Sequence, residues 1–293
     1  MRREEGGPPR SQLELSVERE FQPDRNHDRG GRSFYFFDLD DNVFYLPTPM
    51  YIYHKNSGEE IEMSTGHFAQ IAKEIGKSGY YKDFEVRFQD DSGSYRRFRD
   101  FGLDVESFEQ DVLNVISESD YHWKGPSWSC FYHATFNQRP ISIITARGHS
   151  PHTIRKGLHQ FYQNRLIQHD PNYLGVFPVS NPEVREALGV DPNADVNIPD
   201  LKKRAIFKSV ELAFQKYGQN PYHRFGMSDD DPRNLDLIRD AMTQLKQRYP
   251  KNSFFVISIH NDEMIKEEIA APKTKSVSTE KSNEDDMKQL PLL

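Results

Sequence analysis

Five short apolar runs, separated by much longer segments, constrain the fold of this chain more than any other feature of its sequence. Each run has five to seven residues, lacks the polar alternation of a half-exposed strand and is rich in aromatic or β-branched residues. These properties are typical of strands buried on both faces of a sheet. The runs are FYFFD (34–38), ISIIT (141–145), LGVFPV (174–179), HRFGMS (223–228) and SFFVISI (253–259).

Three of the intervening segments have helical periodicity and a helix start signal. Residues 151–168 begin with Pro151, which directly follows Ser150, residues 200–217 begin with an aspartate, and residues 232–248 begin with a proline. Strands that alternate with helices predict an α/β fold, here a doubly wound (Rossmann-like) parallel sheet of about five strands with helices on both faces. In such sheets, ligands bind at the carboxyl ends of the strands.

The two ends of the chain differ in composition from the rest. Residues 1–32 and 270–293 have almost no apolar periodicity, which predicts disordered tails. The formal net charge of -7 gives no general affinity for nucleic acid or for an anionic membrane, and the sequence shows neither a long apolar run nor a signal peptide. Because Cys130 is the single cysteine, an intrachain disulfide and a Cys-rich zinc site are excluded. A cytoplasmic location is expected.

Polar residues follow the first two apolar runs. Asp38 and Asp40 come at the predicted end of a buried strand, where one carboxylate can attack a phosphoryl group while the other transfers protons. Thr145 adds a hydroxyl at the end of the second run, and the backbone amides from Ala146 onward lie at a strand-to-helix turn that suits an oxyanion. For either aspartate alone, the alternative interpretation is a residue that caps a turn.

Two further carboxylates, Asp229 and Asp230, follow the fourth run and are expected at the same edge of the sheet. Carboxylates that face each other repel, and Mg²⁺ relieves this repulsion because it prefers oxygen ligands and bridges to phosphate oxygens. The alternative is a helix N-cap, which aspartate serves well. Both interpretations hold together if one aspartate caps the helix while its neighbours bind metal.

In this order, the segments FYFFDLDDNV, ISIITARG and FGMSDDD resemble motifs of the haloacid dehalogenase superfamily of phosphohydrolases, over about residues 33–262. The resemblance implies that Asp38 is the nucleophile and Asp40 the general acid/base. It also implies that the Thr145 hydroxyl binds the phosphoryl group. The implied Mg²⁺ ligands are Asp38, the backbone carbonyl of Asp40, Asp229 and Asp230.

The family also places a lysine at the phosphate, and three candidates lie on the helix predicted from residue 200. Lys202 and Lys203 are in its first turn, whereas Lys208 would lie roughly 12 Å beyond the helix start, at the rise of an α-helix. Lys202 ranks first, Lys203 second and Lys208 third, because Lys202 shares a helix face with the apolar side chains. These are Ile206, Val210, Ala213 and Tyr217.

About 95 residues separate the first and second motifs. The predicted catalytic core comprises residues 33–46 and 126–269, with a mixed α+β insertion at 47–125, where members of the family often carry a cap that selects the substrate. Within the insertion we expect a hairpin around Asn56–Gly58 and a second alternating pair that turns at residues 92–93.

Two residues near the motifs need a separate interpretation. Asn42 stands four residues after the predicted nucleophile, where the family usually has Thr or Val. Since Asn can still bond the turn, the departure weakens the resemblance only slightly. Arg147, two residues after Thr145, is interpreted as a solvated or salt-bridged side chain rather than as a substrate ligand.

The expected function is a Mg²⁺-dependent phosphatase that hydrolyses a phosphomonoester through an aspartyl-phosphate intermediate. The expected substrate is a phosphorylated small molecule, with a phosphorylated macromolecule as the alternative if the cap leaves the site accessible. A binding or regulatory module without turnover and a phosphotransferase with the same residues are the alternative functions. The intact Asp38 and Asp40 pair argues against the binding module. The sequence does not predict the oligomeric state or the role of the tails.

Overall fold

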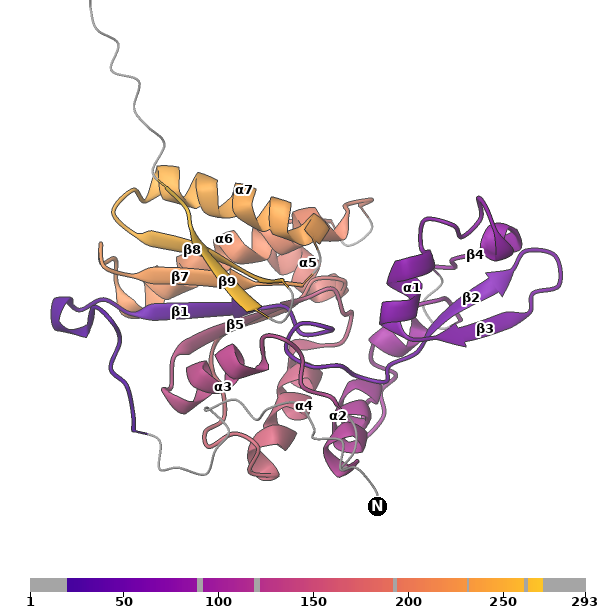
Figure 1. The fold of residues 1–293 in the computed structure, drawn as a ribbon, viewed down its shortest axis with the longest axis horizontal. Coiled ribbons are helices and arrows are strands. Elements are labelled where there is room, and N and C mark those ends of the chain that lie inside the picture. The colour runs from indigo at the N-terminus through magenta and orange to yellow at the C-terminus, as the bar shows by residue number, and fades with distance from the viewer. Residues whose placement is uncertain are drawn as a thin grey trace, which may run out of the picture.

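A computed structural model describes residues 20–88, 92–118, 122–191, 194–230, 232–260 and 263–270. The main body is an α/β fold built on a mixed sheet of six strands in the order β6-β5-β1-β7-β8-β9 (Figure 1). Five strands are parallel, and β9 runs antiparallel to β8. The strands span Ser33–Phe37 (β1), Pro140–Thr145 (β5), Asn172–Pro178 (β6), Arg224–Ser228 (β7), Ser253–His260 (β8) and Glu263–Glu268 (β9).

The five apolar runs form the five parallel strands, and their ends agree with the prediction to within two residues. The prediction of about five strands misses β9. This strand lies at the edge of the sheet, and its Ile265 is 47% exposed. An exposed edge strand needs no continuous apolar run, so the sequence EMIKEE lacks the pattern that reveals the other five.

Side chains of β1 alternate between two hydrophobic cores, one on each face of the sheet. Phe34 and Phe36 belong to the first core, whereas Phe37 belongs to the second and Tyr35 packs against it. Because residues two apart in a strand point to the same face, this alternation places the sheet between two buried layers. Strand β1 is therefore an inner strand that is covered on both faces.

Helices cover both faces of the sheet (Figure 1). One layer contains α5 (Pro182–Ala187), α6 (Ile198–Tyr217) and α7 (Pro232–Arg248), and the other contains α2 (Ser107–Ser117), α3 (Trp128–Phe136) and α4 (Pro151–Gln163). The side chains of Ser150 and Asn197 accept backbone hydrogen bonds as the N-caps of α4 and α6. These caps fix the residues at which the two helices begin.

A smaller antiparallel sheet stands at one end of the main body (Figure 1). With α1 (Thr65–Ile71) it forms the small domain, residues 50–98, whose strands are ordered β3-β2-β4. The hairpin predicted around Asn56–Gly58 is confirmed. The strands span Met50–His54 (β2), Glu60–Met63 (β3) and Phe84–Glu85 (β4).

The prediction of a second alternating strand pair in the small domain is wrong. Strand β4 pairs with β2, with Tyr53 opposite Glu85, and Arg96–Phe98 form a short 3₁₀ helix, η3, in place of a returning strand. The reason lies at the boundary with the main body. The carbonyl of Phe98 accepts a hydrogen bond from the backbone amide of Gly148 at 2.7 Å, so the chain turns out of the sheet to reach the loop after β5.

Helix α2 falls within the residues predicted as insertion, 47–125, but it packs on the main body. Its Phe108, Val112 and Val115 belong to the same core as residues of α4, Ile154 and Leu158 among them. The chain therefore returns to the main body before the predicted boundary at residue 125.

Residues 20–32, predicted as part of a disordered tail, form ordered structure against the main body. Asp24 and Arg139 make a buried ion pair at 2.8 Å, and Asp24 also accepts the backbone amide of Ser33. The remaining predicted tail residues, 1–19 and 271–293, lie outside the described part of the chain. Among the helices that are described, none combines the length and the apolar character needed to cross a membrane.

Candidate active site

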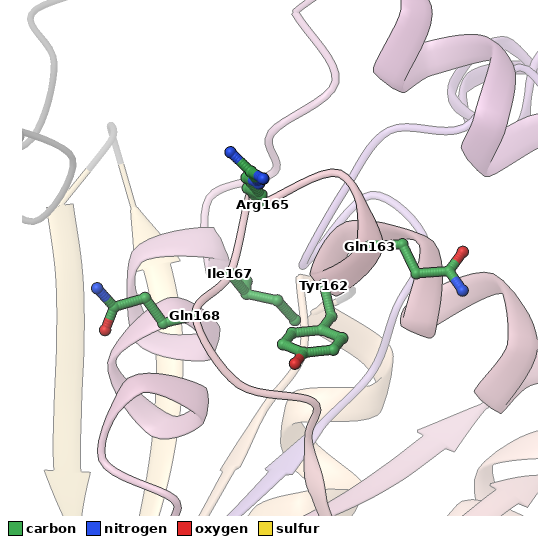
Figure 2. Close-up of a pocket in the computed structure, with 5 residues that line it drawn as sticks. All are labelled: Tyr162, Gln163, Arg165, Ile167 and Gln168. Carbon is green, nitrogen blue, oxygen red and sulfur yellow. The ribbon is translucent and has the colours of Figure 1, made fainter.

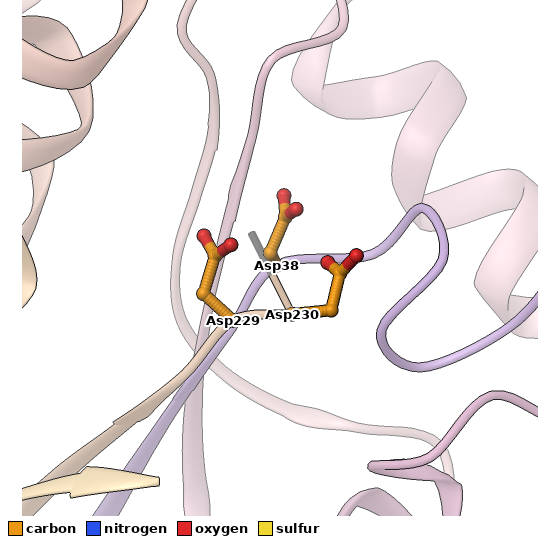
Figure 3. Close-up of side chains that lie close together, drawn as sticks. All are labelled: Asp38, Asp229 and Asp230. Atoms are coloured by element: carbon orange, nitrogen blue, oxygen red, sulfur yellow. The ribbon is translucent and has the colours of Figure 1, made fainter. Parts of the chain in front are cut away.

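The carboxyl ends of β1 and β7 bring three carboxylates together. Phe37 pairs with Ser228 in the parallel ladder, and the backbone amide of Asp38 donates to the Ser228 carbonyl at 3.0 Å. Asp38 therefore lies beside Asp229, the residue that directly follows β7. Figure 3 shows Asp38, Asp229 and Asp230 projecting from these two ends, and oxygen atoms from all three lie within 4.8 Å of one another.

Lys202 lies between two of these carboxylates. Its Nζ is 3.1 Å from Asp38 Oδ2 and 2.8 Å from Asp229 Oδ2, and the side chain is only 2% exposed. Burial alone would lower the pKa of Lys202, but the charges of Asp38 and Asp229 outweigh it and raise the pKa above its usual value. A permanent positive charge is thus fixed beside the predicted nucleophile.

The other two candidate lysines form pairs away from the carboxylate cluster. Lys203 Nζ contacts Asp240 of α7 at 2.6 Å, and Lys208 Nζ lies 3.8 Å from Glu211 of its own helix. The apolar face that Lys202 shares explains the difference, because this face turns toward the sheet. The structure brings Lys202 to the cluster and leaves Lys203 and Lys208 on the outer side of α6.

Asp38 is buried with an unusual balance of charges. Its burial raises its pKa well above the usual value, and although Lys202 acts in the opposite direction, Asp229 and Asp230 add to the increase. Its Oδ1 is buried and has no hydrogen-bond partner among the residues described. Burial and the charge of Asp229 also raise the pKa of Asp230 to about 7.

These features fit a hard divalent cation. The three carboxylates repel one another when they are ionised, and a bound cation removes this repulsion. A buried carboxylate oxygen without a hydrogen-bond partner can also serve as a ligand of such a cation. Asp38, Asp229 and Asp230 would supply those ligands. Clusters of acidic groups also occur without metal, so the unpartnered buried oxygen of Asp38 is the feature that favours an ion here.

Asn42, the departure from the family pattern, holds the loop after β1. Its Nδ2 donates to the carbonyls of Asp38 at 3.0 Å and of Ser228 at 3.1 Å, and its Oδ1 accepts from Ser127 at 2.8 Å. The side chain is fully buried. Asn42 therefore ties the ends of β1 and β7 to each other and to the start of α3.

Three polar residues around the cluster were not predicted. Asn234 donates to Asp229 Oδ1 at 3.0 Å, and Ser127 contacts Ser228 Oγ at 2.5 Å. Asn234 lies in the first turn of α7, directly after the aspartate run, so its proximity to Asp229 is readable in the sequence. Ser127 and Ser228 had no such signal because their contact spans 101 residues.

The side chain of Asp40 faces Arg147 and not the three-carboxylate cluster. Arg147 donates to both oxygens of Asp40, and Thr145 Oγ1 lies 3.5 Å from Asp40 Oδ2. The interpretation of Arg147 as a salt-bridged residue is confirmed. Ala146, whose backbone amide was predicted to bind the phosphate, lies between Thr145 and Arg147 in the chain. Its carbonyl accepts a hydrogen bond from the Ser180 hydroxyl.

A separate hollow lies at the opposite edge of the sheet, where α4 ends and the chain leads into β6 (Figure 2). Its lining contains no carboxylate, and the predicted site residues do not contribute to it. The hollow is therefore not part of the candidate site. The lining residues are Tyr162, Gln163, Arg165, Ile167 and Gln168.

No protein-family model, curated protein or solved structure matches this chain. Its function is therefore inferred from the motifs and from the geometry of the side chains. The contacts that carry most weight are those of Asp38, because it combines burial, a lysine partner and an unpartnered oxygen.

We expect Mg²⁺ to stabilise the protein more at about pH 8 than at about pH 5. The folded-state pKa of Asp230, about 7, lies above its unfolded value of 3.8. The folded protein therefore binds more protons at Asp230 between these values, so the contribution of Asp230 to stability is fully present below the unfolded pKa and is lost as pH rises through the folded pKa. A cation that pairs with the ionised carboxylates restores the loss.

The measurement is thermal unfolding with Mg²⁺ or EDTA at both pH values. The Mg²⁺-dependent rise in Tm should be on the order of 3 °C or more at the higher pH and much smaller at the lower one. In Asp230→Asn, the pH dependence without metal should flatten. Equal Tm shifts at both pH values in the wild type would contradict a cation held by these carboxylates.

Proposed function

We propose that this protein is a Mg²⁺-dependent phosphatase that hydrolyses a phosphomonoester through an aspartyl-phosphate intermediate. The proposal includes a doubly wound, Rossmann-like core of the haloacid dehalogenase type. The observation that carries it is the buried Asp38 carboxylate, which has one oxygen beside Lys202 and the other without a partner among the described residues. A buried carboxylate with so few partners is suited to hold a cation and to react, and its burial does not serve stability alone.

In the first step, an oxygen of Asp38 forms a bond to phosphorus while the bond from phosphorus to the leaving-group oxygen breaks. Lys202 and the Thr145 hydroxyl bind the non-bridging phosphoryl oxygens. The contact of Lys202 with Asp38 supports this role, since a cation beside the nucleophile also lies beside the group that the nucleophile attacks.

Asp40 handles the protons of both steps. Its carboxylic acid protonates the departing oxygen, and the resulting carboxylate then takes a proton from the water that attacks the aspartyl phosphate. The second step forms a bond from the water oxygen to phosphorus and breaks the bond from phosphorus to Asp38, which releases inorganic phosphate. The 3.5 Å contact of Asp40 with Thr145 supports placing the proton donor beside the phosphoryl group.

Asp38, Asp229 and Asp230 are the residues that would hold Mg²⁺, which when bound neutralises negative charge on the carboxylates and the phosphoryl oxygens. Asn234 keeps Asp229 in place through hydrogen bonds to both of its oxygens, at 3.0 and 3.2 Å. Oriented ligand carboxylates of this kind are a common feature of metal sites.

The small domain is the proposed substrate-selecting cap. Its Thr65, at the start of α1, donates a hydrogen bond to Asp41 at 3.3 Å. Asp41 directly follows the proposed acid/base, Asp40, in the chain. This proximity favours a phosphorylated small molecule, whose remainder would contact the small domain while its phosphate reaches Asp38. A phosphorylated macromolecule remains the alternative substrate.

The test is phosphate release from an aryl phosphate and a panel of phosphorylated metabolites, with Mg²⁺ or with EDTA. Wild-type protein should release phosphate only with Mg²⁺, because without it the carboxylates repel the phosphoryl group. Release that needs an added acceptor alcohol would indicate a phosphotransferase. A folded protein that binds Mg²⁺ yet releases no phosphate from any compound, including phosphopeptides, would overturn the proposal in favour of a binding module.

A further inference from the structure

Among the residues that the structure describes, Arg147 is the largest fully buried side chain, with 1% of its surface exposed. Its guanidinium lies between two aromatic rings, 4.8 Å from the centroid of Phe98 and 4.8 Å from that of Phe108. Phe98 belongs to η3 of the small domain and Phe108 to α2. The guanidinium therefore contacts one aromatic ring from the small domain and one from the main body.

The hydrogen bonds of Arg147 point at Asp40. Nε donates to Asp40 Oδ2 at 2.9 Å, and Nη2 donates to Oδ1 at 2.6 Å, which is the two-pronged geometry that fixes the plane of a carboxyl group. Nη2 also donates to Thr48 Oγ1 at 2.8 Å, and Thr48 in turn donates to Asp111 at 2.5 Å. Nη1 is buried without a hydrogen-bond partner in the described part of the chain.

The backbone around Arg147 connects the same groups. Its amide donates to Thr145 Oγ1 at 3.4 Å, and the amide of Gly148 donates to the Phe98 carbonyl at 2.7 Å. A rotation of the guanidinium would break contacts to Asp40 and Thr48 together. Asp40, by contrast, is 21% exposed and precedes Asp41, whose φ of 58° marks a sharp turn.

We propose that Arg147 is a positioning residue that fixes the carboxyl group of Asp40 for proton transfer to the leaving group, and that the small domain keeps Arg147 in place through Phe98. This inference rests on the proposed phosphatase function. A buried ion pair contributes little net stability, so stability alone does not account for burying an arginine with one unsatisfied nitrogen. Orientation of a reacting carboxyl group does account for it.

A purely structural role and a positioning role predict different kinetics. Expulsion of a poor leaving group needs a proton from Asp40, whereas a good leaving group departs as the anion with little help. Loss of Arg147 should therefore slow the turnover of phenyl phosphate much more than that of 4-nitrophenyl phosphate. Damage to the fold would slow both reactions by the same factor.

The experiment compares these two esters in wild-type protein, Arg147→Gln, Asp40→Asn and the double variant, with Mg²⁺. Arg147→Gln should lower kcat for phenyl phosphate by roughly 10²-fold and for 4-nitrophenyl phosphate by less than about tenfold. The double variant should be no slower than Asp40→Asn, because Arg147 acts through Asp40. Arg147→Lys, which keeps the charge without the two-pronged contact, should recover only part of the loss.

Arg139→Gln is the matched control, since Arg139 forms a comparably buried ion pair with Asp24 far from Asp40. It should lower Tm and leave the ratio of the two rates unchanged. Equal losses on both esters in Arg147→Gln and Arg147→Lys, or losses that multiply in the double variant, would overturn this inference while the phosphatase function stands. A folded, Mg²⁺-binding wild type that is inactive on both esters, on the metabolite panel and on phosphopeptides overturns both proposals.

Discussion

Replacing Asp38 with Asn should lower phosphate release by roughly 10⁴-fold or more, because in the proposed mechanism a neutral amide cannot attack phosphorus. Asn has the same size as Asp and keeps one oxygen that can accept a hydrogen bond from Lys202, so the variant should fold. The measurement is kcat for the best substrate of the panel, with Mg²⁺. Mass spectrometry of acid-quenched protein should detect a phosphoryl group on the wild type and none on the variant.

Asp41→Asn is the matched control for this substitution. Asp41 lies three residues further along the same loop, but its Oδ1 accepts a hydrogen bond from Thr65 of the small domain. Asn tolerates the left-handed backbone that Asp41 adopts, so the loop should keep its shape. Its kcat should stay within about tenfold of the wild type. An Asp38→Asn protein that retains more than about a tenth of the activity would show that another group attacks phosphorus.

The site residues that could be predicted from the sequence are those whose positions follow from the parallel sheet. Buried parallel strands leave a clear apolar signature, and their carboxyl ends meet at one edge, so the proximity of Asp38 to Asp229 follows once the strands are identified. Lys202 ranks first because it lies in the first turn of the predicted helix and on its apolar face, and its two ion pairs agree with that choice. Local periodicity was sufficient for these residues.

Residues whose positions depend on long-range polar contacts could not be predicted. The sequence indicates that Arg147 is solvated or salt-bridged, but the identity of its partner depends on a contact with Asp40 across 107 residues. Ordered structure in residues 20–32 depends likewise on the ion pair between Asp24 and Arg139. The composition of a segment indicates how much apolar surface it can bury, but not with which distant charged residue it forms an ion pair.

The small domain shows the limit of strand patterns in short segments. Alternation in residues 79–101 predicts a second hairpin that turns at residues 92–93, and two of these residues, Phe84 and Glu85, do form a strand. The chain then turns into η3, where the backbone of Phe98 bonds to Gly148 and its ring packs on Arg147. Contacts with the main body therefore outweigh the local preference for strand pairing.

Replacing Lys202 with Met destabilises the metal-free protein by about 3–5 kcal/mol, because Asp38 and Asp229 remain buried without their cation. Met fills the space of the aliphatic chain, so the loss comes from charge and not from a cavity. Mg²⁺ should recover part of the stability, since it pairs with the same carboxylates. Chemical denaturation with EDTA or Mg²⁺ measures both effects.

Lys203→Met is the control for Lys202→Met, because Lys203 makes its ion pair with Asp240 at the protein surface. An exposed pair of this kind contributes at most about 1 kcal/mol, and the substitution should leave kcat near the wild-type value. Lys202→Met should lower kcat by roughly 10²-fold or more, since the phosphoryl oxygens lose a fixed positive charge. Equal stability and activity in the two variants would mean that the Lys202 ion pairs stabilise neither the fold nor the phosphoryl group, and would remove Lys202 from the proposed site.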